Sequence, residues 1–230
     1  MIRRILYTTS TSIEAESLMK IAGLEASQTK NRYRYGQMNI DLLITGVGTV
    51  ATTWRISKWL SQNSHPDIAI NAGIAGSFNP LIKIGDAVMP VSDCFADAGI
   101  EDGNRFFTLR EASIISDSDF PFQGDFIHCN NLFCKKLAQT VKPVNAITVN
   151  TATGSTITKE KLTARFNPDI ETMEGAAFFY VSSLEKIPFI AIRAVSNIVE
   201  QRDKAKWNIP LALENMTAKL TEILEILSQL

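Results

Sequence analysis

Two acidic side chains stand in an apolar stretch where a strand pattern changes into a helix pattern. Residues 170–180 read IETMEGAAFFY, and Glu174 precedes the small residues of the helix start. A buried carboxylate is costly without a partner. Glu174 would lie at the carboxyl end of a strand, which is where ligands bind in open α/β sheets. The competing interpretation is that Glu174 caps the helix and complements its dipole.

The next apolar strand pattern, residues 187–199, also carries polar side chains towards its end. Arg193 comes first, and Ser196 and Asn197 follow. Two consecutive strands therefore bring polar groups towards one edge of a sheet. Glu14, in the first turn of a helix after the first strand, and the small-residue stretch 73–76 occupy equivalent positions after strands.

These residue types suit a nucleoside. A carboxylate can accept both hydrogen bonds of a cis-diol, which is a use for Glu174. A second carboxylate near the anomeric carbon, Glu14, could orient a water molecule and take its proton. Neither step needs a cofactor or a metal, and we expect none.

Composition narrows the class of protein. The 230 residues are 45% hydrophobic with a net charge of −1, which predicts a soluble chain with one core and a single domain over residues 1–230. No basic face indicates nucleic acid, and no apolar run is long enough for a signal peptide or a membrane span. The three cysteines lack the spacing of a disulfide framework or zinc site, which favours the cytoplasm.

Short apolar runs alternate with helical patterns along the chain. This predicts an α/β fold: a single three-layer domain with a central mixed, mostly parallel sheet flanked by helices. Ser12 is the expected N-cap of the first helix. Residues 68–71 are expected as a strand that ends in a loop over residues 73–76. The irregular stretch 95–130 is expected to cover a site or an interface. Apolar residues spaced along 211–230 predict a helix with one face on the core.

Two other motifs were weighed. Residues 46–51 match G-x-G-x-x-A, a dinucleotide fingerprint, but they follow a later strand, and the next strand ends at Asn71 where an acid would be needed. A dehydrogenase is therefore disfavoured. No G-x-S-x-G serine nucleophile motif is present.

Several segments carry a resemblance to known proteins. NAGIAG (71–76), TMEGAA (172–177) and FIAIRAVSN (189–197) resemble the superfamily of purine nucleoside phosphorylases and methylthioadenosine/adenosylhomocysteine nucleosidases. The stretch 193–216, together with EAES (14–17) and FADAGIEDG (95–103), is most similar to its futalosine hydrolase branch, which serves menaquinone biosynthesis. The resemblance runs from residue 5 to about residue 216.

The resemblance implies a small-molecule nucleoside ligand, no cofactor, and a homo-oligomer, specifically a dimer. It implies that Glu14 activates water, that Glu174 binds the ribose hydroxyls, and that Arg193 braces the water and the acidic cluster. The other residues that it places around the nucleoside are Met173 at the ribose, Ala75 and Gly76 beside sugar and base, and the backbone around Ile157 and Thr158 beside the purine.

One position departs from the adenine-specific nucleosidases. They carry an Asp that protonates N7 after the serine of this motif, whereas this chain has Asn197. An amide cannot protonate, but it can donate one hydrogen bond and accept another. That suits a 6-oxopurine such as the hypoxanthine of futalosine. Asn197 is therefore included among the expected catalytic residues.

Hydrolysis is favoured over phosphorolysis because residues 8–14 contain no Arg and do contain Glu14, which would repel phosphate. A phosphorylase, an adenine-type nucleosidase and a non-catalytic nucleoside-binding module remain alternatives. The retained Glu14 argues against a mere binder, which has no use for a water-activating carboxylate.

Overall fold

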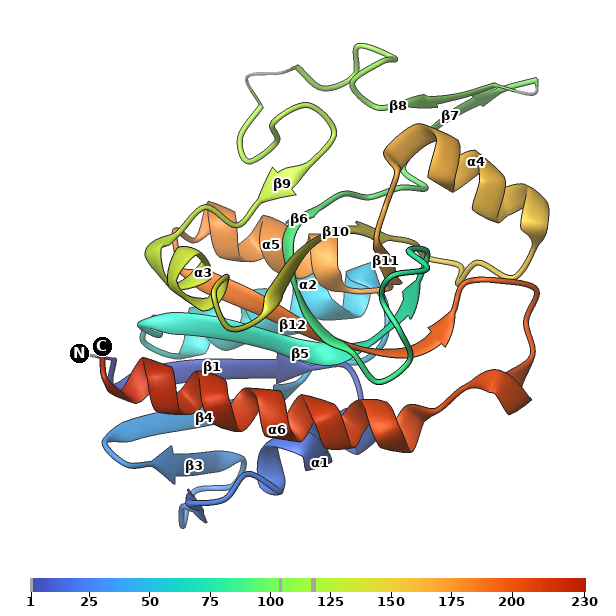
Figure 1. Cartoon of the computed structure of the whole chain (residues 1–230). Coiled ribbons are helices and arrows are strands. Elements are labelled where there is room, and N and C mark those ends of the chain that lie inside the picture. The colour runs from blue at the N-terminus through green and yellow to red at the C-terminus, as the bar shows by residue number, and fades with distance from the viewer. Residues whose placement is uncertain (1, 104, 117–118) are drawn as a thin grey trace.

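Most strands of the molecule belong to one large mixed sheet (Figure 1). The computed structural model describes residues 2–103, 105–116 and 119–230. The strand order is β11-β10-β6-β12-β5-β1-β4-β3-β2, with β9 beside β6, and β7 and β8 form a separate hairpin. The strands are β1 (Arg4–Thr9), β2 (Leu24–Ala26), β3 (Arg32–Tyr35), β4 (Met38–Ile44), β5 (Ile68–Ser77), β6 (Ala87–Asp93), β7 (Gly99–Asp102), β8 (Arg105–Thr108), β9 (Ile127–His128), β10 (Lys142–Thr148), β11 (Ile170–Thr172) and β12 (Phe189–Ile198).

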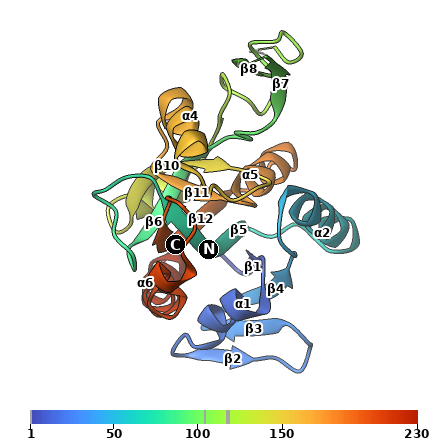
Figure 2. The same ribbon diagram turned by 90° about the vertical axis from the view of Figure 1, so that its right-hand side faces the viewer.

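Helices cover the sheet on two sides (Figure 2). One side carries α1 and α6, the other carries α2 and α5, and α4 lies beside the β7–β8 hairpin. The helices are α1 (Ser12–Met19), α2 (Thr49–Gln62), α3 (Leu132–Leu137), α4 (Thr156–Phe166), α5 (Gly175–Leu184), the 3₁₀ turn η1 (Lys204–Lys206) and α6 (Ile209–Ser228). The expected apolar face of α6 is confirmed, with Met216, Leu220 and Leu227 fully buried.

The sheet differs from the predicted flat central layer because it closes on itself. Strand β11 pairs in parallel with β10 and antiparallel with β5, which joins two strands that are far apart in the strand order. Antiparallel ladders also join β12 to β6, β3 to β4 and β2 to β3, so the sheet is mixed, while its longest ladders, β12 with β5 and β1 with β4, are parallel. The α/β class is confirmed, and the three-layer description is replaced by a barrel-like one.

Strand β5 accounts for much of this closure. The sequence predicted a short strand ending in a loop at residues 73–76, but β5 continues through Gly73 and Gly76 to Ser77. Its first half pairs with β1 and its last residues pair with β11. The register of β12 against β5 shifts between Val195 and Asn197, and glycines and such bulges let strands bend sharply. The glycine-rich segment is therefore strand, and it lies where two parts of the sheet meet.

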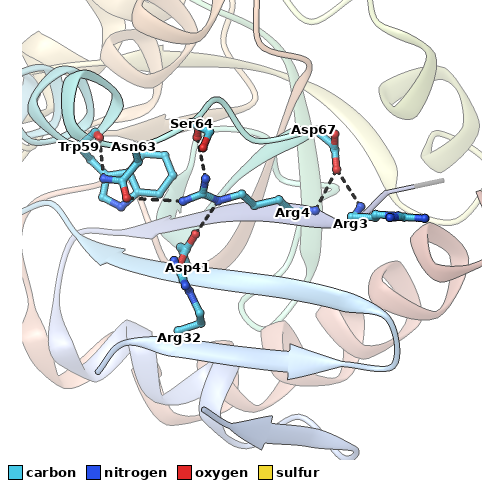
Figure 3. A network of polar contacts seen from close by, with 8 residues as sticks. All are labelled: Arg3, Arg4, Arg32, Asp41, Trp59, Asn63, Ser64 and Asp67. Carbon is cyan, nitrogen blue, oxygen red and sulfur yellow. Dashed lines mark hydrogen bonds and ion pairs between the residues drawn. The ribbon is translucent and has the colours of Figure 1, made fainter. Parts of the chain in front are cut away.

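A polar network connects the start of β1 with β3 and β4 (Figure 3). It lies at the opposite end of β1 from the expected site. Asp41 accepts hydrogen bonds from Arg4 Nε at 2.9 Å and from Arg32 Nε at 2.6 Å. The Arg4 guanidinium also donates to the Ser64 carbonyl and lies over the ring of Trp59. This network links β1, β3 and β4 to the end of α2, so we assign it to stability.

No helix in the described ranges 2–103, 105–116 and 119–230 has the length and apolar character needed to cross a membrane.

Candidate active site

Three hydrogen bonds hold the Glu14 carboxylate in place beyond the carboxyl end of β1. Thr11, not the expected Ser12, is the N-cap of α1, and it forms a capping box with Glu14. The Glu14 carboxylate accepts hydrogen bonds from Thr11 N at 2.9 Å, from Thr11 Oγ1 at 2.8 Å and from Ile74 N at 3.0 Å. A Cβ at Gly73 would lie only 2.7 Å from Glu14 Oε1, so glycine is what lets this carboxylate rest against β5.

Glu174 lies at the N-cap position of α5, as the capping interpretation requires, but its side chain does not cap the helix. Its Oε1 instead accepts a hydrogen bond from Gly48 N at 2.9 Å, across to the start of α2. Burial raises the pKa of Glu174, and the negative charge of Glu14 raises it further, against the Gly48 hydrogen bond and the charge of Arg193. The two carboxylates therefore share one electrostatic environment.

The guanidinium of Arg193 lies beneath these acids and is only 2% exposed. It donates to the Asn71 carbonyl at 2.9 Å and to the Ile192 carbonyl at 3.0 Å, and it also bonds the Asn71 side chain. Burial lowers the pKa of Arg193, and the charges of Glu174, Glu14 and Asp93 counteract that effect. A buried cation thus balances three acids contributed by three segments of the chain.

Asn197 lies near the end of β12, opposite Gly76 in the register. Its Nδ2 donates to the Ile198 carbonyl at 3.2 Å, and Ser196 Oγ lies 2.8 Å from its Oδ1. Since the amide nitrogen faces a carbonyl, the orientation of the side chain is fixed, with one N–H left over. A Cβ at Gly76 would lie 3.2 Å from Asn197 Nδ2, so this glycine gives the amide room.

A small cavity of about 120 Å³ contains Asn197. Its other walls include Ala152, Thr153, Ile84 and Trp207. The size suits one edge of a planar heterocycle, and the Asn197 amide is one of several polar groups in the lining.

The sequence profile of the phosphorylase superfamily matches residues 14–228, which is almost the whole chain. The chain belongs to the phosphorylase superfamily.

Relatives within the phosphorylase superfamily include futalosine hydrolases. The futalosine hydrolase of Streptomyces coelicolor is 28% identical over 235 residues, covering 96% of each protein. The 5'-methylthioadenosine/S-adenosylhomocysteine nucleosidase of Buchnera aphidicola is 28% identical over 209 residues, covering 83% of this chain and 80% of the relative.

Solved structures share the fold at lower identity. The Helicobacter pylori 5'-methylthioadenosine/S-adenosylhomocysteine nucleosidase with butyl-thio-DADMe-Immucillin-A has a TM-score of 0.80 at 16% identity, covering 98% of this chain and 99% of that one. The futalosine hydrolase of H. pylori has a TM-score of 0.79 at 16% identity with the same coverage.

The other predicted site residues lie on β5, just before Glu174, and on α4. Ala75 is buried on β5, and Met173 is half-buried immediately before Glu174. Ile157 and Thr158 lie in the first turn of α4, where Ile157 is 67% exposed. Thr158 lines a separate cavity of about 760 Å³ between α4 and the β7–β8 hairpin, which does not include Asn197. Their contact with a purine stays a prediction.

Two features of the site were not found from the sequence. Thr153 lines the Asn197 cavity, and its backbone N–H donates to Glu171 Oε1 at 2.9 Å, so Glu171 holds this loop in place. Gly48, taken only as part of a dinucleotide motif, is the donor to Glu174. The sequence signal for the Thr153 contact was Glu171, the first of the two acids in IETMEGAA. For Gly48 the signal was glycine after a strand, which also fits many other turns.

Proposed function

We propose that this protein hydrolyses the N-glycosidic bond of a 6-oxopurine nucleoside, with futalosine as substrate and hypoxanthine as the released base. The observation that carries the proposal is the Glu14 carboxylate, which is anchored by Thr11 and Ile74 at the same strand ends as Glu174 and Arg193. The similarity to futalosine hydrolases over nearly the whole chain supports it.

In this proposal the two carboxylates have different tasks. Glu174, free of a capping role, accepts hydrogen bonds from the ribose hydroxyls, while Met173 packs against the sugar. Glu14 orients a water molecule and takes its proton as the glycosidic bond breaks. Burial and the charge of Glu14 raise the pKa of Glu174, and the buried charge of Arg193 lowers it.

Hydrolysis rather than phosphorolysis is supported by how the local donors are used. The N–H groups of Thr11 and Ile74 and the Thr11 hydroxyl all donate to the Glu14 carboxylate. These are the groups that would have to receive a phosphate beside the sugar at the end of β1. A carboxylate of the protein already occupies them, and it repels a second anion.

The base is assigned from Asn197. Its orientation leaves one N–H that can donate to N7 or O6 of a 6-oxopurine, both of which are acceptors. Protonation of a departing adenine would need an acid at this position. In this proposal Ala75 and Gly76 of β5 lie beside the sugar and the base. The proposed assembly is a homodimer.

The test is to incubate the purified protein in phosphate-free buffer with futalosine, inosine, adenosine and methylthioadenosine, and to identify the released base and sugar. We expect hypoxanthine and a free reducing sugar. Turnover that requires added phosphate and yields a sugar 1-phosphate would show a phosphorylase instead. Release of adenine alone would show an adenine-type nucleosidase.

A further inference from the structure

One fully buried acid has no task in the proposed reaction. Asp93, the last residue of β6, is 0% exposed. Its Oδ1 accepts a hydrogen bond from Thr148 Oγ1 at 2.9 Å, whereas its Oδ2 has no hydrogen-bond partner. A carboxylate kept in such a place at the cost of burial needs an explanation.

Asp93 lies against the first turn of the helix that carries Glu174. A Cβ at Gly175, the first residue of α5, would lie 2.1 Å from Asp93 Oδ2, so the carboxylate is in contact with the helix backbone itself. The side chain of Asp93 and the start of α5 are therefore packed as a unit.

Two threonine hydroxyls connect Asp93 to the first backbone N–H groups of α5, which have no partner within the helix. Ala176 N donates to Thr148 Oγ1 at 2.8 Å, and Gly175 N donates to Thr172 Oγ1 at 3.1 Å. The two hydroxyls lie 3.1 Å apart. The single proton of the Thr148 hydroxyl is donated to Asp93, so Thr148 can only accept from Thr172. The Thr172 hydroxyl therefore donates to Thr148, and the direction of each hydrogen bond in this network is fixed.

This chain of hydroxyls does the work that an N-cap side chain normally does. A helix start leaves N–H groups that the N-cap residue usually satisfies. Glu174 occupies the N-cap position without capping, and its carboxylate points to Gly48 instead. Thr172 and Thr148 satisfy these N–H groups in its place, and Asp93 orients both hydroxyls.

We propose that Asp93 is a positioning residue for Glu174: through Thr148 and Thr172 it fixes the first turn of α5 and leaves the Glu174 carboxylate free to bind the sugar. The proposal rests on the proposed function for the role of Glu174. It assigns Asp93 no contact with the substrate.

The experiment compares Asp93→Ala, which removes the oxygen that accepts from Thr148, and Thr148→Val with a matched control, Ser92→Ala. Ser92 precedes Asp93 on β6, is also buried, and its hydroxyl donates to Asn145 Oδ1 at 2.7 Å on the same neighbouring strand. The control thus removes a buried hydrogen bond between β6 and β10 without touching α5. Steady-state kinetics of hypoxanthine release from futalosine are measured for each variant, well below its unfolding temperature.

We expect Asp93→Ala and Thr148→Val each to lower kcat/KM about tenfold, mainly through KM, while Ser92→Ala changes it by less than about twofold. The decisive step is a double-mutant cycle. In a Glu174→Gln background, Asp93→Ala should cost less than about twofold, because the carboxylate that Asp93 positions is already gone. Equal losses in both backgrounds would overturn the proposal, as would an unchanged KM in both Asp93→Ala and Thr148→Val.

Hydrogen exchange separates this proposal from the proposed function. The amides of Gly175 and Ala176 should exchange faster in Asp93→Ala and Thr148→Val than in wild type and Ser92→Ala, with no ligand present. If the wild type released no base from any nucleoside, the proposed function would fail, and unchanged exchange would separately disprove the anchoring of α5 by Asp93.

Discussion

Replacing Glu14 with glutamine tests whether this residue activates water or only caps α1. In the structure both carboxylate oxygens are used, with Oε2 accepting from Thr11 and Oε1 accepting from Ile74 N. Glutamine offers one oxygen and one NH₂ group, so in either orientation a backbone N–H faces another donor. A buried donor without a partner costs about 1–3 kcal/mol, which is the loss of unfolding free energy that we expect.

The effect on turnover should be larger than this loss of stability explains. Removing a general base lowers the rate by about 10²–10⁴-fold, and KM should change little because Glu14 is not assigned to the ground-state substrate. Glu174→Gln should behave differently. It weakens a contact made already in the ground state, so we expect KM to rise and kcat to fall together.

A control separates catalysis from helix capping. Asn131 is the N-cap of α3, where its Oδ1 accepts from Cys134 N at 3.1 Å. Asn131→Ala should lose a comparable amount of stability, about 0.5–2 kcal/mol for a lost cap, and keep its turnover. Urea denaturation gives the stabilities, and hypoxanthine release gives kcat and KM. Near-normal kcat in folded Glu14→Gln would refute the assignment of Glu14 as the base.

Three further predictions concern specificity, stability and pH. Asn197→Asp should shift the ratio of kcat/KM for inosine over adenosine by about tenfold towards adenosine, and an unchanged ratio would remove Asn197 from base recognition. Asp41→Asn should lower the unfolding free energy by about 2 kcal/mol in urea denaturation without changing turnover, because its network with Arg4 and Arg32 lies at the opposite end of β1 from the site. Burial is the main cause that raises the pKa of Asp93 from 3.8 to about 7, and the charge of Glu174 raises it further. The Thr148 hydrogen bond and the charge of Arg193 lower this pKa but do not outweigh burial. Between these two pKa values the native state holds a proton that the unfolded state has lost. The unfolding free energy of the wild type should therefore fall relative to that of Asp93→Asn by about 1.4 kcal/mol per pH unit from pH 5 to 6. Stability curves of the two proteins that run parallel would contradict this.

Much of the fold was predictable because its signals are local. The strands β1, β4 and β12 contain short apolar runs, and α6 has apolar residues at helical spacing, so each pattern lies within one segment of the sequence. The strands β2 and β3 were not predicted, because β2 has only three residues and β3 alternates between arginine and tyrosine without an apolar run.

The glycine-rich segment of β5 shows where local signals mislead. Two glycines in NAGIAG favour a loop by propensity, yet the segment is strand because neighbours on both sides supply hydrogen bonds. The glycines are needed for space, since the carboxylate of Glu14 and the amide of Asn197 lie where side chains would be. Propensity describes the isolated chain, and pairing in the sheet overrides it.

The sequence by itself determined which chemical groups were available: Glu14, Glu174, Arg193 and Asn197, each at or near a strand end. Only the tertiary structure decided the long-range contacts of Glu174 and Arg193, because these contacts join residues more than a hundred positions apart, Glu174 with Gly48 and Arg193 with Asn71. It also revealed Asp93, whose sequence surroundings on β6 give no sign that its carboxylate lies against α5. Contacts of this kind depend on how β6, β10 and α5 pack together, which no spacing within a single segment encodes.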